Sequence, residues 1–201
     1  MITKKTVWNT KINKYRKEHE GSHKDDSRKY VVQHIQKNTI KSVLEIGVGS
    51  GIFIDNLKSG GIDIEYTGID ASVEFLRVVG EKYPDIKLVK HDCDVTLPFL
   101  DNEFELCFAR HVIEHIKGFK NIISEMHRVC SREIIVVLFR PLLDGPDQIK
   151  FREHKGAYYN SYSKKGMLKL CGKLFSKHHL IESEGNTAGH HGKNWILHCV
   201  K

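Results

Sequence analysis

The sequence predicts an α/β fold, in which helices cover both faces of a doubly wound, mostly parallel sheet. Two observations predict it. Short apolar runs of strand length alternate with helical stretches over most of the 201 residues, which is typical of βαβ units. The first run, residues 43–46, ends directly in a glycine-rich turn that contains Gly47, Gly49 and Gly51. Ligands of such folds bind at the carboxyl ends of the strands, so we expect the site there.

The composition is ordinary for a globular domain, with 40% hydrophobic and 28% charged residues. The five cysteines lie far apart without a Cys-x-x-Cys pair, and residues 1–5 begin no apolar signal segment. We therefore expect a protein of the reducing cytoplasm. No apolar run approaches the roughly 20 residues that a membrane-spanning helix needs, so we expect no membrane partner.

The positive charge is concentrated at the amino-terminal end. The net charge of +7 is accounted for by residues 1–41, because basic and acidic residues balance in the remainder of the chain. We expect residues 1–40 to form a basic helical arm or lid and residues 41–201 to form the main domain. Such an arm suits RNA, an acidic lipid surface or an anionic substrate. The alternative is a solvated helical face, because acids are interleaved with the basic residues.

Two helices are expected in the arm. Residues 6–20 carry Trp8, Ile12 and Tyr15 at three- and four-residue spacing, which is typical of an amphipathic helix. Residues 25–37 form the second helix, with Tyr30, Val31, His34 and Ile35 on one face. The aromatic side chains either fold over the site as a lid or hold the arm against the core.

The first strand carries an acid, Glu45, just before the glycine turn, and a helix is expected to follow from Ile52. A dinucleotide fingerprint would need its third glycine at Ile52, and a phosphate-binding loop would need a Gly-Lys-Ser/Thr ending that is absent. Pyrophosphate is therefore disfavoured as the ligand. The glycines still let some ligand approach the bare backbone.

A second strand is expected at residues 64–70 and ends in Asp70, which lies 19 residues beyond Gly51. A carboxylate at this position is placed to accept hydrogen bonds from both hydroxyls of a ribose. Its alternative role is to cap the helix expected over residues 72–82, but Ser72 is the better cap.

The remaining elements continue the alternation. Strands are expected at residues 86–90, 104–109 and 134–139, and helices at residues 121–129 and 163–171. Residues 140–162 look like an irregular insertion. Its tyrosines favour an ordered structure. Residues 180–184 and 195–200 form a predicted terminal hairpin.

Several of these segments together resemble the class I methyltransferases that depend on S-adenosylmethionine (SAM), especially the subgroup that methylates small molecules. The resemblance covers roughly residues 40–140. Its motifs are residues 43–51, Gly68-Ile69-Asp70, His91-Asp92-Cys93, residues 97–105 and His111-Val112-Ile113-Glu114-His115. It implies a Rossmann-like, seven-stranded sheet whose last strand is antiparallel.

The resemblance also implies the roles of single residues. Glu45 and the Gly47 backbone would hold the methionine end, Asp70 the ribose, and Asp92 with the Cys93 amide the adenine. Ala109 and Arg110 would lie beside the methionine moiety, where Arg110 would pair with the cofactor carboxylate or with an anionic acceptor. The full set of expected cofactor-binding residues is Glu45, Gly47, Gly49, Gly51, Asp70, Ala71, Asp92, Cys93, Ala109 and Arg110.

Methyl transfer needs a base only when the acceptor carries a proton, and histidine is the usual base. His111 and His115 are the candidates, with His111 nearer the acceptor side; the alternative is that each is a helix cap or a packed group. We expect a small-molecule acceptor. RNA is the alternative because of the basic arm.

A different class of enzyme is also compatible with one motif. His111, Glu114 and His115 spell the His-x-x-Glu-His of inverted zinc peptidases, although the position after a buried strand argues for a turn. No metal site is predicted elsewhere. The five histidines at 178, 179, 190, 191 and 198 are expected to lie on the surface.

Overall fold

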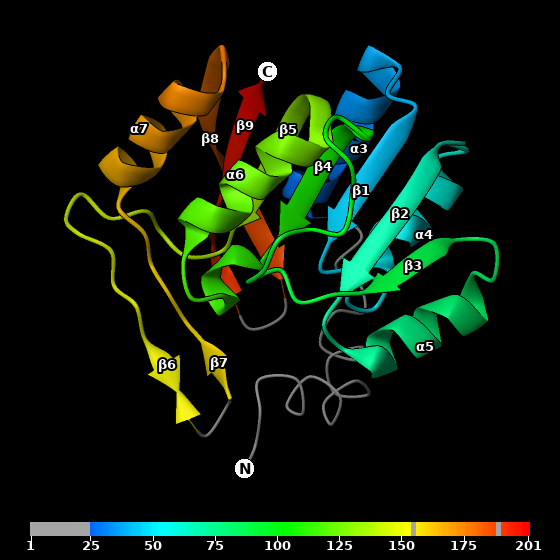
Figure 1. Cartoon of the computed structure of the whole chain (residues 1–201), viewed down its shortest axis with the longest axis horizontal. Coiled ribbons are helices and arrows are strands. Elements are labelled where there is room, and N and C mark those ends of the chain that lie inside the picture. Colours follow the sequence, from blue (N-terminus) through cyan, green and yellow to red (C-terminus); the bar gives the residue numbers. More distant parts are fainter. Residues whose placement is uncertain (1–24, 154–155, 188–189) are drawn as a thin grey trace.

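In the computed structural model, which describes residues 25–153, 156–187 and 190–201, a central sheet has the strand order β3-β2-β1-β4-β5-β9-β8 (Figure 1). Its first five strands run parallel, whereas β9 is antiparallel to both of its neighbours. The predicted sheet with an antiparallel last strand is confirmed. The strands are β1 (Ser42–Ile46), β2 (Glu65–Asp70), β3 (Lys87–Lys90), β4 (Phe104–Arg110), β5 (Cys130–Leu138), β8 (Lys177–Thr187) and β9 (His190–Val200).

Helices cover both faces of this sheet (Figure 1). On one face, α3 (Asp26–Asn38), α4 (Ile52–Ser59) and α5 (Val73–Lys82) bury a core that includes Val31, Phe53 and Val79. On the other face, α6 (Phe119–Val129) and α7 (Lys164–Leu174) pack over a second core. Because the helices cover the two faces of the sheet, the carboxyl ends of the parallel strands form one continuous edge between the helical layers.

The helix boundaries follow from their caps. Asp25 accepts a hydrogen bond from the Ser27 amide at the start of α3, and Ser72 accepts one from the Phe75 amide at the start of α5. The prediction that Ser72 rather than Asp70 caps α5 is confirmed. Because α3 packs against α4 and β8, the second predicted helix is part of the fold, whereas the division of the chain at residue 40 stays a prediction.

The insertion is built around a short hairpin, β6 (Phe151–Arg152) with β7 (Ala157–Tyr158), near the lower left of Figure 1. Two of its polar side chains are buried: Asn160 donates to the Ile116 carbonyl, and the Tyr162 hydroxyl donates to the Ile113 carbonyl. These hydrogen bonds tie the insertion to the segment that follows β4, where η2 (Ile113–His115) lies.

The terminal hairpin is longer than predicted, because pairing of β8 and β9 continues to Thr187 and His190. Backbone hydrogen bonds can pair two strands whose side chains show no apolar alternation. The polar sequence at the tip of the hairpin therefore gave no sign of the extra pairing. The surface prediction was wrong for His198, which is only 6% exposed. His179 is exposed and His178 half-buried, whereas the side chains of His190 and His191 fall outside the description.

The first expected helix, residues 6–20, and its lid role lie outside the described residues. Among the helices that are described, none has both the length and the apolar character needed to cross a bilayer.

Candidate active site

The glycine loop lies between β1 and α4 and folds back onto the end of β2. Gly47, Gly49 and Gly51 all have positive φ values, of 79°, 53° and 79°, which a residue with a side chain rarely adopts. The Gly47 amide donates to the Ile69 carbonyl at 2.8 Å. A Cβ atom on Gly47 would lie 2.3 Å from Val112 Cγ2. The loop therefore needs glycine for its conformation and, at Gly47, also for space.

Asp70 ends β2 beside this loop. Its Oδ2 accepts from the Gly49 amide at 2.9 Å, and its Oδ1 accepts from the Ser72 amide at 2.8 Å. Burial raises the pKa of Asp70, whereas the amides of Ser72, Gly49 and Ala71 act in the opposite direction by favouring the carboxylate. The carboxylate is thus held in one orientation at the predicted ribose position.

Glu45 is buried at the end of β1, where the Tyr66 hydroxyl donates to its Oε2. Burial raises the pKa of Glu45 to about 8, although the hydrogen bond and the charges of Arg28 and Arg110 favour the carboxylate. A Cβ on Gly68 would lie 2.4 Å from Val48 Cγ2 and 3.0 Å from the Tyr66 hydroxyl. Gly68 therefore makes room for this buried pair.

The sheet order brings the other predicted residues to the same edge. Because β3, β2, β1 and β4 are neighbours and parallel, their carboxyl ends present Asp92, Asp70, Gly47 and Ala109 in a row. Asp92 follows β3 and accepts from the Asp94 amide at 3.2 Å, and Cys93 is partly buried beside it. Their contact with a cofactor stays a prediction.

Known proteins resemble this chain in both sequence and fold. Residues 44–138 match the family model described as a methyltransferase domain. Over 103 residues the chain is 31% identical to malonyl-[acyl-carrier protein] O-methyltransferase of Hamiltonella defensa subsp. Acyrthosiphon pisum (strain 5AT), a match that covers 51% of this chain and 38% of that protein. Over these matched residues the chain is similar to the class I SAM-dependent methyltransferases. The match spans little more than a third of that relative's length.

Solved structures of methyltransferases have the same fold. Magnesium protoporphyrin IX methyltransferase from Synechocystis PCC 6803, solved with bound SAM, aligns with a TM-score of 0.72 and 13% identity over 100% of this chain and 98% of that one. The 1,6-didemethyltoxoflavin-N1-methyltransferase of Burkholderia thailandensis aligns with a TM-score of 0.63 and 11% identity over 97% and 87% of the two chains. At these identities the likeness establishes the methyltransferase fold alone.

Within this methyltransferase fold, Arg110 is paired with the start of α3. Its Nη2 lies 3.1 Å from Asp25 Oδ2, and its Nε donates to the Ser27 hydroxyl at 3.2 Å. The side chain is 4% exposed. The expected partner was a cofactor carboxylate or an anionic acceptor, whereas the described partner is Asp25.

His111 follows β4 with a left-handed φ of 56°, a strained conformation that is frequent at functional sites. Its Nε2 donates to Asn194 Oδ1 at 3.1 Å, and the Asn194 amide donates to Asp25 at 3.2 Å. Burial, followed by the charge of Arg110, lowers the pKa of His111 well below 6.5. The imidazole is therefore neutral, with its lone pair on Nδ1.

His115 ends η2 and contacts the insertion. Its Nδ1 donates to the Tyr158 carbonyl at 2.8 Å, and its ring packs against Tyr159 and Phe139 with centroid distances of 5.0 and 5.6 Å. Phe139 also contacts the His111 ring at 5.2 Å. The two candidate histidines thus share an aromatic neighbour, and the insertion contacts one of them directly.

The zinc-peptidase motif does not have the required geometry. His111 lies in the turn and His115 in a 3₁₀ helix, so the two imidazoles do not share one face of an α-helix. Glu114 is 1% exposed and accepts from the Phe139 amide at 2.7 Å. Burial raises its pKa to about 7. Its role in the described structure is to hold the start of the insertion.

Three residues of this site were not anticipated. Tyr66, Asp25 and Asn194 contact Glu45, Arg110 and His111, respectively. Asp25 had a signal in the sequence, because an aspartate just before a helix is a typical cap. Asn194 had no such signal in the sequence, since it lies on β9, 83 positions after His111.

Proposed function

We propose that this chain transfers a methyl group from SAM to a small-molecule acceptor. The observation that carries the proposal is the Asp70 carboxylate, which the Gly49 and Ser72 amides orient at the tip of β2 beside the glycine loop. The Ser72, Gly49 and Ala71 amides favour the charged carboxylate, whose two oxygens offer about four lone-pair sites. A carboxylate held in this way suits the hydroxyls of a ribose.

The surroundings of the loop favour a nucleoside without phosphates. Glu45 and Asp70 both lie beside it, and Asp70 contributes to raising the pKa of Glu45. The Asp70 carboxylate repels an anionic pyrophosphate and attracts a cation. SAM carries an ammonium and a sulfonium, so its charge suits the site.

When bound, SAM supplies a methyl group on a sulfonium, which an acceptor lone pair displaces in line. The chain would contribute mainly alignment and exclusion of water, which can supply on the order of 7–11 kcal/mol. We propose that Glu45 faces the ammonium, Asp92 and Cys93 the adenine, and Ala109 and Arg110 the methionine moiety. The remaining loop positions Gly47, Gly49, Gly51 and Ala71 would contact the cofactor through their backbone.

We propose His111 as the base for an acceptor that carries a proton, with His115 as the second candidate. Support comes from the neutral state of His111 and from the hydrogen bond that leaves its Nδ1 as the acceptor atom. The contacts of His115 with Tyr158 and Tyr159 support an acceptor pocket bordered by the insertion. A pocket that is bordered by a few side chains suits a small-molecule acceptor.

RNA remains the second candidate because of the basic amino-terminal segment. If RNA is the acceptor, binding should weaken steeply as salt rises. Removal of residues 1–24 leaves Asp25 in place and should then abolish RNA binding. Unchanged RNA affinity after this deletion would refute the version in which the basic segment binds RNA.

The cofactor proposal is tested by calorimetry with SAM on Asp70→Ala. Loss of two hydrogen bonds to a charged group should weaken binding on the order of 100-fold or more. Asp85→Ala, an exposed aspartate at the opposite end of the strands, is the control and should bind normally. Near-native affinity of a folded Asp70→Ala chain would refute the ribose assignment. Labelled SAM incubated with a metabolite extract then identifies the acceptor.

A further inference from the structure

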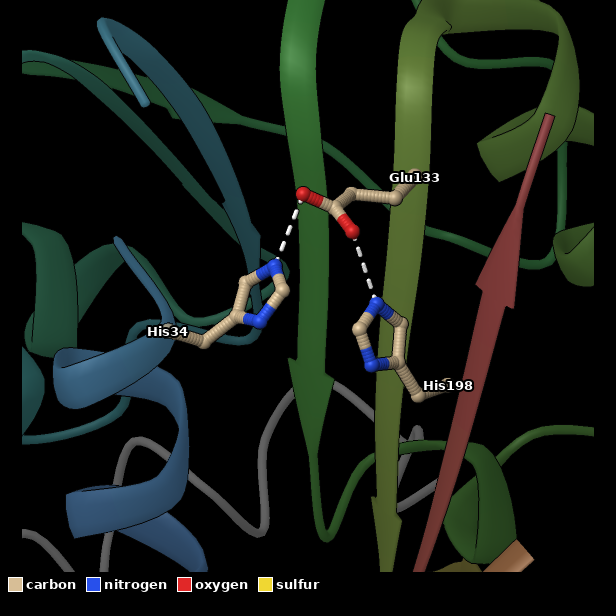
Figure 2. Close-up of side chains that lie close together, drawn as sticks. All are labelled: His34, Glu133 and His198. Carbon is tan, nitrogen blue, oxygen red and sulfur yellow. Dashed lines mark hydrogen bonds and ion pairs between the residues drawn. The ribbon is translucent and has the colours of Figure 1, made fainter. Parts of the chain in front are cut away.

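A second cluster of side chains lies away from the cofactor edge. Figure 2 shows His34 of α3, Glu133 of β5 and His198 of β9 pointing toward one another. His34 Nε2 lies 2.8 Å from Glu133 Oε1, and His198 Nε2 lies 2.7 Å from Glu133 Oε2. One ligand atom from each residue falls within 4.8 Å of the other two.

The cluster is buried but can be reached. The side chains of Glu133 and His198 are 7% and 8% exposed, whereas that of His34 is 15% exposed. Glu133 lies near the amino end of β5, and β9 runs antiparallel to it. The cluster therefore lies toward the amino ends of the parallel strands, whereas the glycine loop lies at their carboxyl ends. It is thus separate from the proposed methyl-transfer site.

Both imidazoles have an outer partner on their second nitrogen. The Tyr30 hydroxyl lies 2.8 Å from His198 Nδ1, and the Asn38 amide lies 3.1 Å from His34 Nδ1. Outer hydrogen bonds of this kind orient metal-ligating histidines and select their tautomer. A set of two imidazoles and one carboxylate is also the protein donor set of some catalytic zinc sites.

We propose that His34, Glu133 and His198 bind one divalent transition-metal ion, with Zn²⁺ as the ion that the donor set fits. Zinc bonds of about 2.0–2.2 Å in a tetrahedral site place ligand atoms about 3.3 Å apart. The two nitrogen–oxygen separations of 2.8 and 2.7 Å would open by about 0.5 Å, and all the ligand atoms already lie within 4.8 Å of one another, so side-chain rotation can bring them to this spacing. Water occupies the fourth position, as in other zinc sites with three protein ligands.

A ring nitrogen that binds the metal carries no proton, so in the metal-bound form each imidazole carries its proton on Nδ1. There the Tyr30 hydroxyl oxygen accepts it from His198, and the Asn38 side chain rotates so that its oxygen accepts it from His34. The ion would then join α3 to β5 and β9, and its role is to hold α3 on the sheet.

The test uses the full chain after treatment with a chelator and dialysis. We expect one Co²⁺ per chain, with the visible absorption of a tetrahedral site, and its displacement by Zn²⁺. Zinc at about 100 times its dissociation constant should raise the melting temperature by about 5–10 °C. Absence of a saturable one-to-one signal with either ion overturns the proposal.

Two variants locate the site. His34→Gln replaces the most exposed ligand and should weaken metal binding on the order of 100-fold or more, given that loss of outer partners alone costs 10–100-fold. His178→Gln, a half-buried histidine on β8 that is paired with Cys199, is the control and should bind normally. Both must retain the circular dichroism of the parent. Equal metal affinity of His34→Gln and the parent would mean that the cluster is only a hydrogen-bond network.

SAM binding distinguishes this proposal from the proposed function. Metal binding should persist in Asp70→Ala, and SAM binding should persist in His34→Gln. Metal binding that disappears with Asp70→Ala in a folded chain would contradict the separation of the two sites.

Discussion

The Arg110 guanidinium lies 3.1 Å from the Asp25 carboxylate, and both side chains are almost completely buried. The pair connects the carboxyl end of β4 to the residue that caps α3. It anchors the amino-terminal helix at the predicted cofactor edge, next to the hydrogen bond between Asn194 and His111.

Asp25→Ala should lower the free energy of unfolding by about 3 kcal/mol, because removal of one partner leaves a buried charge and also removes a helix cap. Asp26→Ala is the matched control, since Asp26 forms an exposed pair with Lys29 in the described part of the chain, and its effect should stay within about 0.5 kcal/mol. Urea unfolding measures both. An effect below about 1 kcal/mol for Asp25→Ala would mean that the pair is not formed in solution.

Gly47→Ala should destabilise the chain by about 2–3 kcal/mol, because a left-handed φ costs about 1–2 kcal/mol and the new Cβ collides with Val112. Gly61→Ala has a similar φ of 61° but nothing within 4 Å, so it reports the backbone cost alone. Val112→Ala in the Gly47→Ala chain should recover part of the difference. Equal unfolding free energies for Gly47→Ala and Gly61→Ala would contradict the close contact.

Glu45→Gln should make stability less dependent on pH. The folded-state pKa of about 8 lies above the ordinary 4.5, so the unfolded chain releases the Glu45 proton first. Stability from this group is full below pH 4.5 and is lost as pH rises toward 8, on the order of 1 kcal/mol per pH unit. The variant should therefore be more stable than the parent at pH 8 and similar to it at pH 4.5.

Above pH 8, where Glu45 is charged, the same variant should bind SAM more weakly than the parent, because a neutral amide cannot pair with an ammonium. Thermal unfolding across this pH range, followed by calorimetry with SAM, separates the two effects. A parent and a variant with parallel stability curves between pH 4.5 and 8 would show that Glu45 does not titrate as inferred.

His111→Gln should lower kcat on the order of 100-fold for a hydroxyl or ammonium acceptor, with little change in SAM affinity. Because the pKa of His111 is depressed below 6.5, its neutral form persists at lower pH. The pH at which kcat/KM declines on the acid side should therefore lie below the usual pKa range of histidine. His127→Gln on α6 is the control. An unchanged kcat in His111→Gln would assign the base role to His115 or to no residue.

The fold could be predicted largely from local sequence. Apolar runs such as residues 43–46 and the acid at Asp70 depend on neighbours within one strand–turn–helix unit, so periodicity and turn chemistry reveal them. The same holds for Ser72, whose capping role is local. The antiparallel β9 followed from the family resemblance, whereas the strand order came from the structure.

The contacts around the site depended on distant segments. Asn194 and Asp25 are 169 positions apart, and no local pattern relates them. His198 was misjudged for the same reason: its neighbours in sequence are those of a surface hairpin, but α3 covers it, and Tyr30 and Glu133 hydrogen bond to its two nitrogens. By itself the sequence determined the strands, the glycine loop and the acids at their ends, because these need only nearest neighbours. Only the tertiary structure decided which buried charges meet, since that depends on how the sheet order brings remote side chains within a few ångströms.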